Sequence, residues 1–160
     1  MDVTTRHADA EDGTALLDLW HGFTDHLSEY DDRYRHKENA DERWLTYFEN
    51  QLVDSKYGTV VVAESDGELV GVVEARIMGN HPIFRLEDHG YVNGLYVIEP
   101  YRNEGVARSM LEAAVEWFRA SPRHVNFYRI NAIEGDETAQ ETYEALGFTP
   151  VEHVYEKQLE

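Results

Sequence analysis

A segment in the second half of the chain has the residue types of an anion-binding turn. Residues 95–111 read Leu-Tyr-Val-Ile-Glu-Pro-Tyr-Arg-Asn-Glu-Gly-Val-Ala-Arg-Ser-Met-Leu. A strand that ends here, before a glycine that opens a helix, directs unpaired backbone N–H groups and a positive helix end toward one point. Gly105 has no side chain where an anion approaches, Ala107 is small, and Arg102 and Arg108 add cationic donors. The pattern predicts a phosphate-binding turn.

The turn resembles a known cofactor-binding motif. Residues 102–107 match Arg/Gln-x-x-Gly-x-Gly/Ala, the signature of GNAT N-acetyltransferases, in which main-chain amides of the turn bind the pyrophosphate of acetyl-CoA. The preceding residues 95–97 resemble the bulged strand of that family, whose backbone holds the pantetheine arm and the acetyl carbonyl. The resemblance implies a cofactor-binding set made of Leu95, Tyr96, Val97, Arg102, Asn103, Glu104, Gly105, Val106, Ala107 and Arg108.

A second segment supports the same resemblance. Asp136, Ala139, Tyr143, Gly147 and Phe148 follow the spacing of the family's Asn-x-x-Ala-x-x-x-Tyr-x-x-x-Gly-Phe pattern. Tyr143 stands where the family has its usual proton donor to the CoA thiolate, and the alternative role for its ring is helix packing. Asp136 replaces the family's asparagine, and an ionised aspartate offers only acceptors. Asp136 therefore either contacts the cofactor or caps the helix that it begins.

The resemblance implies that a neutral primary amine attacks the thioester directly in a ternary complex, without an acyl-enzyme. The amine arrives as an ammonium ion, so a base is needed. Many relatives have a carboxylate two positions before Leu95, where this chain has Asn93, which can still orient a water that relays the proton. Our candidate base is Glu74, because it interrupts the apolar run at 69–77 and burial would raise its pKa. The alternative is a solvent-facing glutamate in an acidic protein.

The resemblance also implies partners, and the sequence leaves one competing function open. The resemblance implies acetyl-CoA as co-substrate, a small-molecule amine or a protein amino group as acceptor, and a homodimer as in many relatives. The rival is a module that senses acyl-CoA without turnover. A Rossmann nucleotide site would need Gly-x-Gly-x-x-Gly near an early strand, and the sequence has none. The histidines form no His-x-x-x-His pair, so we expect no metal. Weaker candidates for the base are Glu99, His89 and residues 29–32.

Periodicity predicts the elements that position these residues. Two β-rich runs, at 58–64 and 69–77, flank Asp66-Gly67, a pair that suits the positive φ angles of a type I′ turn. The other expected strands are at 3–7, 91–98 and 125–132, with one or two closing strands within 148–158. The expected helices are at 11–29, from 39 on, at 105–120 and at 136–146. A loop at 30–39 and a looser connection at 79–90 join them. We expect one α+β domain over residues 1–160, with a mixed, mostly antiparallel twisted sheet flanked by helices, as in the GNAT fold.

The charge of the chain excludes one class of partner. It has 32 acidic and 14 basic residues, a net charge of −18, which repels nucleic acid phosphates. Periodic apolar segments argue against disorder, so we interpret the charge as adaptation to the salt-rich cytoplasm of a halophilic microbe.

The sequence has neither a run of about 18 apolar residues nor an apolar N-terminal segment, so we expect a cytoplasmic protein without a membrane span. The absence of cysteine excludes a thiolate metal site and a cysteine nucleophile.

Overall fold

Two consecutive residues in the left-handed region close the central hairpin. In this computed structural model, which describes residues 2–79 and 82–159, Asp66 and Gly67 have φ angles of 52° and 79°. They join β2 (Gly58–Ser65) to β3 (Glu68–Met78) as an antiparallel pair. The predicted turn is confirmed, because a type I′ turn requires positive φ at both central residues.

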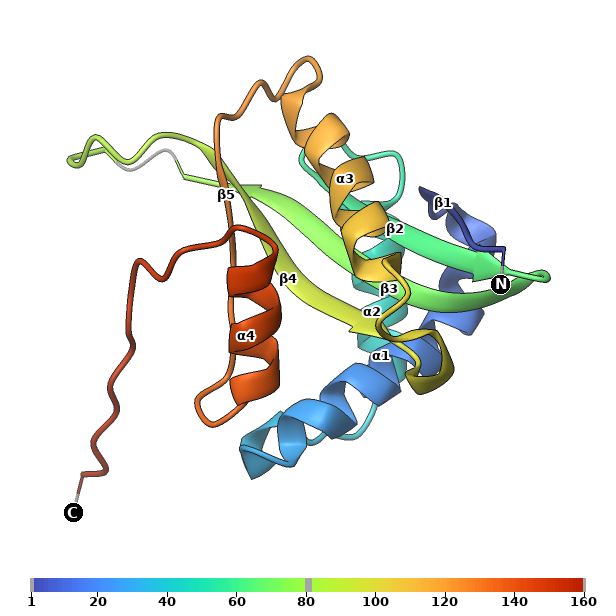
Figure 1. The fold of residues 1–160 in the computed structure, drawn as a ribbon, viewed down its shortest axis with the longest axis horizontal. Coiled ribbons are helices and arrows are strands. Elements are labelled where there is room, and N and C mark those ends of the chain that lie inside the picture. Colours follow the sequence, from blue (N-terminus) through green and yellow to red (C-terminus); the bar gives the residue numbers. More distant parts are fainter. Residues whose placement is uncertain (1, 80–81, 160) are drawn as a thin grey trace.

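The hairpin lies at the centre of a mixed five-stranded sheet with the order β1-β2-β3-β4-β5 (Figure 1). β1 (Thr4–His7) pairs with β2, and β4 (His89–Val97) pairs with β3, both antiparallel. β5 (Tyr128–Ile130) is parallel to β4. The mixed, mostly antiparallel α+β fold expected from the sequence is therefore confirmed.

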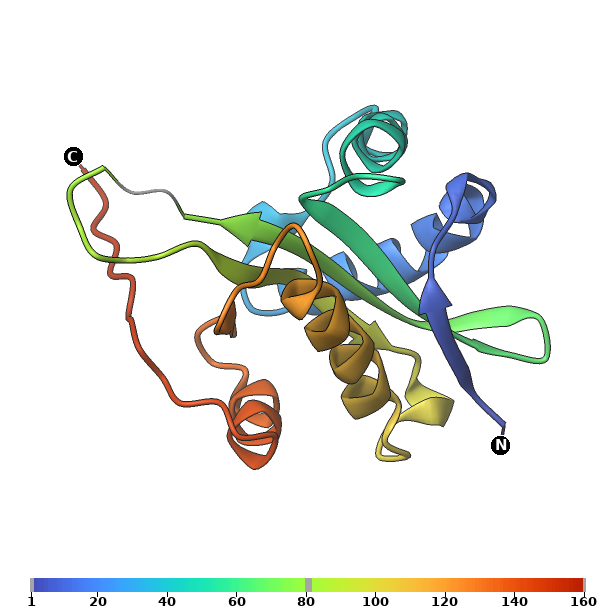
Figure 2. The ribbon, with the colours of Figure 1, turned by 90° about the horizontal axis from the view of Figure 1, so that it is seen from above.

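Helices cover both faces of the sheet (Figure 2). α1 (Gly13–Ser28) and α2 (Ala40–Tyr47) lie on one face, and α3 (Val106–Arg119) and α4 (Glu137–Ala145) lie on the other. Shorter helical turns are η1 (Ala10–Asp12), η2 (Asp32–Tyr34), η3 (Phe48–Leu52) and η4 (Glu99–Tyr101). None of the helices in the described ranges is long and apolar enough to cross a membrane.

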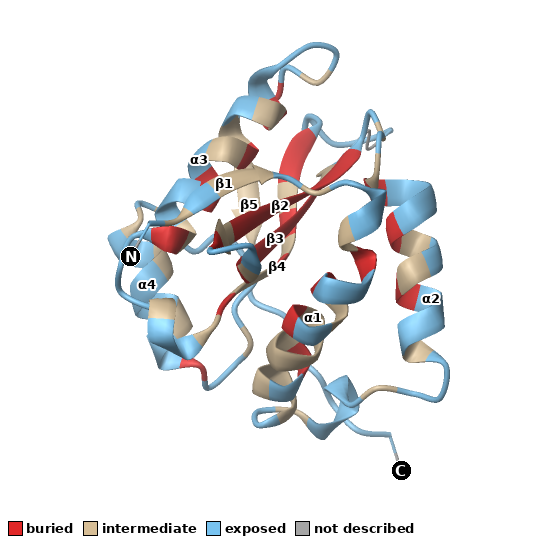
Figure 3. Cartoon of the chain, turned by 90° about the vertical axis from the view of Figure 1, so that its right-hand side faces the viewer, coloured by how far each residue is buried: buried red, intermediate tan, exposed pale blue. Residues whose placement is uncertain are grey.

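Each face of the sheet has its own apolar core, so β2 and β3 are buried from both sides (Figure 3). The core on the α3 side includes Val61, Ala63, Val73, Ala75, Met110, Ala114 and Phe118. The core on the α1 side includes Leu16, Trp44, Phe48, Val60, Val62 and Val72. Because side chains alternate along a strand, Glu74 shares the face of Val72 and points toward α1 and α2.

The expectation of closing strands at 148–158 is wrong. Residues 149–159 form no strand, are exposed along their whole length and extend away from the sheet (Figure 1). A strand exists only where a neighbouring backbone supplies hydrogen bonds, and no described residue supplies them to this segment. β5 is shorter than the expected 125–132 for a related reason, since β4 pairs with only three of its residues. The expected connection at 79–90 includes residues 80 and 81, which lie outside the described residues.

Candidate active site

The predicted phosphate-binding turn forms a tight connection between β4 and α3. After η4, Asn103 and Gly105 adopt φ angles of 64° and 80°, and α3 begins at Val106. No side chain caps the first turn of α3 within the described residues, and its first internal hydrogen bond runs from Ser109 N–H to the Gly105 carbonyl. The N–H groups of residues 106–108 therefore have no partner in the helix and point out of its positive end, where an anion is stabilised.

The surroundings of this helix end leave room for a ligand. A Cβ atom built on Gly105 would have no neighbouring heavy atom within 4 Å. Arg102 links the turn to the strand, because its Nε donates a 2.8 Å hydrogen bond to the Val97 carbonyl. Its guanidinium also lies over the ring of Tyr96, 5.5 Å from the centroid. The exposed side chains of the turn include those of Arg102, Asn103, Glu104 and Arg108.

β4 and β5 diverge beside this turn. β5 pairs only with residues 90–92, and residues 94–97 pair with β3 alone among the described strands. Ile98 N–H donates to the Val70 carbonyl of β3 at 3.0 Å, so the alternation of an antiparallel pair directs the Tyr96 N–H to β3 as well. The N–H groups of Leu95 and Val97 therefore point toward the gap beside β5. Amides without a strand partner among the described residues thus occur where the family resemblance places the acyl-CoA arm.

Asn93 occupies an irregularity in β4. The neighbouring residues Glu74 and Ala75 pair with Gly94 and Val92, so Asn93 is the extra residue of a β-bulge. The bulge precedes residues 95–97, the segment that resembles the bulged strand of the family. Asn93 Nδ2 donates a 2.7 Å hydrogen bond to Glu74 Oε2, so two of the residues expected to handle the proton lie together.

Glu74 is buried, with 5% of its surface exposed, so the alternative of a solvent-facing glutamate is wrong. Burial raises the pKa of its carboxyl above the usual value, and the Asn93 donor, the charge of Arg76 and the nearby Trp44 indole oppose that rise. Glu74 Oε1 and Trp44 Nε1 are both buried, and neither makes a hydrogen bond to a described residue. One carboxylate oxygen is therefore held and the other is left for a further partner.

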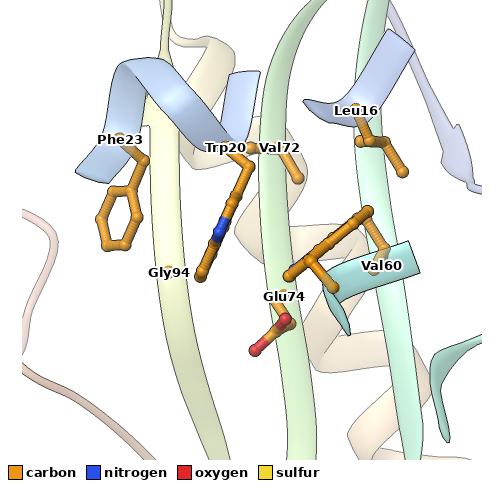
Figure 4. A pocket seen from close by; sticks show the side chains of 8 residues that line it. Leu16, Trp20, Phe23, Val60, Val72, Glu74 and Gly94 are labelled. Atoms are coloured by element: carbon orange, nitrogen blue, oxygen red, sulfur yellow. The ribbon is translucent and has the colours of Figure 1, made fainter. Parts of the chain in front are cut away.

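A small cavity lies beside Glu74, between α1 and the sheet (Figure 4). Its volume is about 10 Å³, close to the space that one water needs. In Figure 4, Trp20 extends from α1 toward Gly94 of β4, and Phe23 lies beside it. The lining residues are Leu16, Trp20, Phe23, Trp44, Val60, Val72, Glu74 and Gly94. Sequence analysis singled out neither of the two aromatic residues of α1, so it missed their place at the site.

Asp136 fixes the start of α4 and joins it to α1. Its Oδ1 accepts a 3.1 Å hydrogen bond from Ala139 N–H, and its Oδ2 lies 2.7 Å from His26 Nε2. The helix-cap alternative is therefore confirmed, and both carboxylate oxygens are engaged with protein groups. His26 stands 110 positions earlier in the chain, and no local sequence signal connects the two residues.

Tyr143 lies on the opposite face of the sheet from Glu74. Burial, and next the Asp136 carboxylate, raise the pKa of Tyr143 to about 12, so its hydroxyl is protonated at neutral pH. Its ring contacts Phe148 with the centroids 6.0 Å apart, and Phe148 in turn contacts Tyr128 of β5 and packs against the core on the α3 side. Glu74 and Asn93 thus flank one side of the diverging strands, and Tyr143 flanks the other.

The weaker candidates for the base lie elsewhere. His89 is buried, stacks on Phe127 at 4.9 Å between centroids, and has its Nδ1 2.9 Å from the Glu87 carbonyl. Glu99 begins η4. In the acidic cluster, Asp31 caps η2 and pairs with Arg33. These contacts give His89 and Asp31 structural roles.

One group of three side chains outside this site has the residue types of metal ligands. His21, His36 and Asp41 offer ligand atoms that lie within 4.8 Å of one another. His21 Nε2 is 2.7 Å from Asp41 Oδ1, and His36 Nε2 is 2.8 Å from the hydroxyl of Thr24. A search for two histidines on one helix missed this group, because α1, the segment before α2, and α2 each contribute one member. The protein's own hydrogen bonds account for the group, and the absence of a metal stays a prediction.

Comparisons with known proteins agree with this fold. The tetramutant of the BH1408 protein from Bacillus halodurans is 20% identical, with a TM-score of 0.80 over 98% of this chain and 99% of that one. Aminoglycoside N-acetyltransferase AAC(6')-Iy in complex with CoA is 16% identical, with a TM-score of 0.72 over 99% and 95%. Ribosomal-protein-alanine N-acetyltransferase from Brucella melitensis is 18% identical, with a TM-score of 0.70 over 99% and 100%.

These identities show a shared fold, and a search of curated proteins gives no significant match. The family itself is shown by sequence, because the model of the Acetyltransferase (GNAT) family matches residues 20–148. That range contains the turn at 102–107, the buried Glu74 and the whole of α4. The chain belongs to the GNAT acetyltransferase family.

Proposed function

We propose that this protein is an acetyl-CoA-dependent N-acetyltransferase in which a primary amine attacks the thioester directly in a ternary complex. The observation that carries the proposal is the buried Glu74–Asn93 pair, which lies at the bulge before the unpaired amides of Leu95 and Val97. Burying a carboxylate costs stability, and a module that only binds acyl-CoA gains nothing from that cost.

The residues present fit acetyl-CoA as co-substrate. Backbone amides of residues 105–108 hold the pyrophosphate in this proposal, since the end of α3 is uncapped and Gly105 leaves space beside it. Arg102 and Arg108 add positive charge next to the turn. The amides of Leu95 and Val97 bind the pantetheine arm and the acetyl carbonyl. The bound thioester supplies an acetyl group that is activated for transfer.

Proton transfer is divided between the two faces of the sheet. Glu74 accepts the proton of the incoming ammonium group through a water in the adjacent cavity, using the oxygen that Asn93 leaves free. A raised pKa suits this role, because a base works best when its pKa lies near the working pH. Tyr143, which stays protonated, donates to the sulfur of the leaving thiolate.

The acceptor side favours a cationic amine. Trp20, Phe23 and Trp44 present aromatic surface next to Glu74, and aromatic faces attract ammonium groups. The acidic residues of the segment at 29–32 lie at the end of α1 and add to the attraction. The acceptors of the structural neighbours, aminoglycosides and the ribosomal-protein alanine, are amines of this kind.

Release of free thiol from acetyl-CoA tests the proposal. The panel contains an aminoglycoside, a polyamine and a peptide with N-terminal alanine, and the assay is run in molar KCl. We expect thiol release that depends on at least one amine. CoA binding by calorimetry without thiol release for any amine would contradict the proposal and favour an acyl-CoA-binding module.

A further inference from the structure

Two polar side chains beside the proposed base, Tyr47 of α2 and Arg76 of β3, have no role in the proposed mechanism. Arg76 Nη1 donates a 3.4 Å hydrogen bond to the Tyr47 hydroxyl. Both side chains are half-buried, and Tyr47 packs against the apolar core on the α1 side of the sheet. The contact therefore places the Arg76 guanidinium on the same face of the sheet as Glu74.

The register of β3 brings Arg76 close to Glu74. Residues two positions apart on a strand share a face, and their Cα atoms are about 6–7 Å apart. On the opposite strand, Glu74 pairs with Gly94 and Arg76 pairs with Tyr91. The bulge residue Asn93, which donates to Glu74, lies between these two pairs. Arg76 thus flanks the bulge on one side and Glu74 flanks it on the other.

Tyr47 lies close to both members of the Glu74–Asn93 pair. Burial, and next the charge of Glu74, raise the pKa of the Tyr47 hydroxyl, whereas Arg76 and the Asn93 side chain oppose that rise. Asn93 holds Glu74 through Oε2, so the hydroxyl lies toward this oxygen. Arg76, Tyr47 and Asn93 therefore form one polar cluster on the Oε2 side of the carboxylate.

The other side of the carboxylate faces apolar surroundings. Among the described residues that line the adjacent cavity, Glu74 alone carries a charge. α1 and β2 contribute apolar side chains, α2 contributes the Trp44 ring, and β4 contributes Gly94. Tyr47 and Arg76 are not among the lining residues, so they leave the place of the water and the incoming amine open.

A buried carboxyl needs help to ionise. In apolar surroundings the charged form is costly, and an unassisted carboxyl takes up a proton instead. A protonated Glu74 could not act as a base. Burial raises the pKa of Glu74, and the Asn93 donor and the positive charge of Arg76 both oppose the rise. Of these two groups, Arg76 is the one that supplies a full charge.

We propose that Arg76 is a positioning residue for the proposed base: held by the Tyr47 hydroxyl, its guanidinium is the counter-charge that lets the buried Glu74 ionise. The inference rests on the proposed function, because it gives Arg76 a part in catalysis only through Glu74. Without this charge Glu74 would stay protonated up to a higher pH, and the incoming ammonium group would meet an acid in place of a base.

The titration of Glu74 tests the proposal without any turnover. Protein labelled with ¹³C at the glutamate carboxyl groups is titrated by NMR at a fixed salt concentration, and the Glu74 signal is the one that Glu74→Gln lacks. In Arg76→Gln we expect the midpoint to rise by about one pH unit, as loss of a nearby opposite charge requires. Arg76→Lys keeps the charge and should restore most of the wild-type midpoint. Equal midpoints in Arg76→Gln and wild type would overturn the proposal.

Tyr47→Phe tests the hydroxyl that holds Arg76. The ring and the arginine charge both remain, so we expect the Glu74 midpoint to rise by less than in Arg76→Gln. An unchanged midpoint in Tyr47→Phe would exclude Tyr47 from the pair.

The pH dependence of thiol release separates this role from a structural one. Below the pKa of the base, a rise of one unit leaves tenfold less ionised base, so Arg76→Gln should lose about tenfold in kcat/KM at acid pH and approach wild type at high pH. Arg119→Gln is the matched control, because it removes the same charge from an exposed position of α3 on the other face of the sheet. Its profile should match that of wild type. A loss in Arg76→Gln that is independent of pH, or an equal shift in Arg119→Gln, would refute the role of Arg76.

The two readouts also separate this inference from the proposed function. A shifted Glu74 titration in Arg76→Gln, in a protein that releases no thiol, would support the counter-charge and refute the acetyltransferase activity. Amine-dependent thiol release together with an unshifted titration would refute the counter-charge and support the activity.

Discussion

Asn93 donates a 2.7 Å hydrogen bond to Glu74 across the β3–β4 pair. The family resemblance places a carboxylate at the Asn93 position in many relatives, whereas here an amide stands there and the acidic group is on the neighbouring strand. The bulge at Asn93 is what brings the two side chains together. The bond engages Glu74 Oε2 and leaves Oε1 without a partner in the described residues, beside a cavity of one-water size.

Glu74→Gln tests the proposed base. The substitution keeps the shape and removes the ability to accept a proton, so we expect turnover to fall about 10²–10⁴-fold. The affinity for CoA should hardly change, because the turn at 102–107 is untouched. Glu68→Gln is the matched control, an exposed glutamate on the same strand, and should keep full activity. Equal rates for Glu74→Gln and wild type, with chemistry rate-limiting, would exclude Glu74 as the base.

The same substitution has an expected effect on stability. The pKa of Glu74 is raised in the folded protein, so the folded state binds the proton more tightly than the unfolded chain does. Ionisation of Glu74 therefore destabilises the fold, by an amount that is absent below the unfolded pKa of about 4.3 and grows until the pH passes the folded pKa. We expect the melting temperature of Glu74→Gln, relative to wild type, to rise from acid to neutral pH. A difference independent of pH would contradict the raised pKa.

Local patterns predicted much of the site from the sequence. Asp66-Gly67 identified the hairpin because few residue pairs accept two positive φ angles. Glu74 stood out because it interrupts an apolar run, and the run reflects burial of β3 on both faces. In each case the information lies within a few residues of the feature that it predicts.

Contacts between distant segments could not be predicted in the same way. His26 and Asp136 pair because α1 and α4 come together in the fold, and neither residue carries a signal of the other. The closing strand was a different error. Residues 151–159 have a strand's composition, but a strand also needs a neighbouring strand that supplies its hydrogen bonds. The sequence of the segment does not show whether such a neighbour is present.

Tyr143→Phe tests the proposed donor to the thiolate. The change keeps the ring against Phe148 and removes only the hydroxyl, so we expect turnover to fall about 10²–10⁴-fold at constant CoA affinity. Because the pKa of Tyr143 is about 12, the wild-type rate should show no loss from Tyr143 ionisation between neutral pH and about pH 10. Tyr128→Phe is the control, since Tyr128 contacts the same Phe148 from β5. An unchanged rate in Tyr143→Phe would exclude Tyr143 as the proton donor and show that its ring serves only in packing.

Gly105→Val tests the phosphate-binding turn. Gly105 has a φ of 80°, a conformation that costs other residues about 1–2 kcal/mol, so we expect the melting temperature to fall by roughly 2–8 °C. The protein offers open space at this position, so no clash should add to that cost. The branched side chain would occupy the space proposed for the pyrophosphate, and CoA binding should be lost. Gly105→Ala also places a Cβ at this positive φ, at a cost no greater than that of the β-branched valine, and has a smaller side chain, so it helps to separate strain from obstruction. Wild-type CoA affinity in Gly105→Val would remove the turn from the proposed site.

The last prediction concerns salt, and it tests the halophilic interpretation of the net charge of −18. A folded chain of this length has a radius of gyration of about 15 Å. At 0.01 M salt the Debye length is about 30 Å, so nearly every excess carboxylate repels the others, whereas at 1 M it is about 3 Å and only close neighbours interact. We therefore expect the melting temperature to climb with KCl concentration.

The shape of that climb identifies its cause. The Debye length falls from about 30 to 10 Å between 0.01 and 0.1 M salt, and only by a further 7 Å or so up to 1 M. Screening of repulsion therefore predicts a steep early rise that flattens, whereas exclusion of salt from the surface predicts a steady rise. Anionic CoA approaching an acidic protein gains from the same screening, and its backbone-amide contacts are local and lose less. The Michaelis constant for acetyl-CoA should then not worsen in molar KCl as it would at a site of lysines and arginines alone. Equal melting temperatures in dilute buffer and in molar KCl would refute the halophilic interpretation and leave the family assignment unchanged.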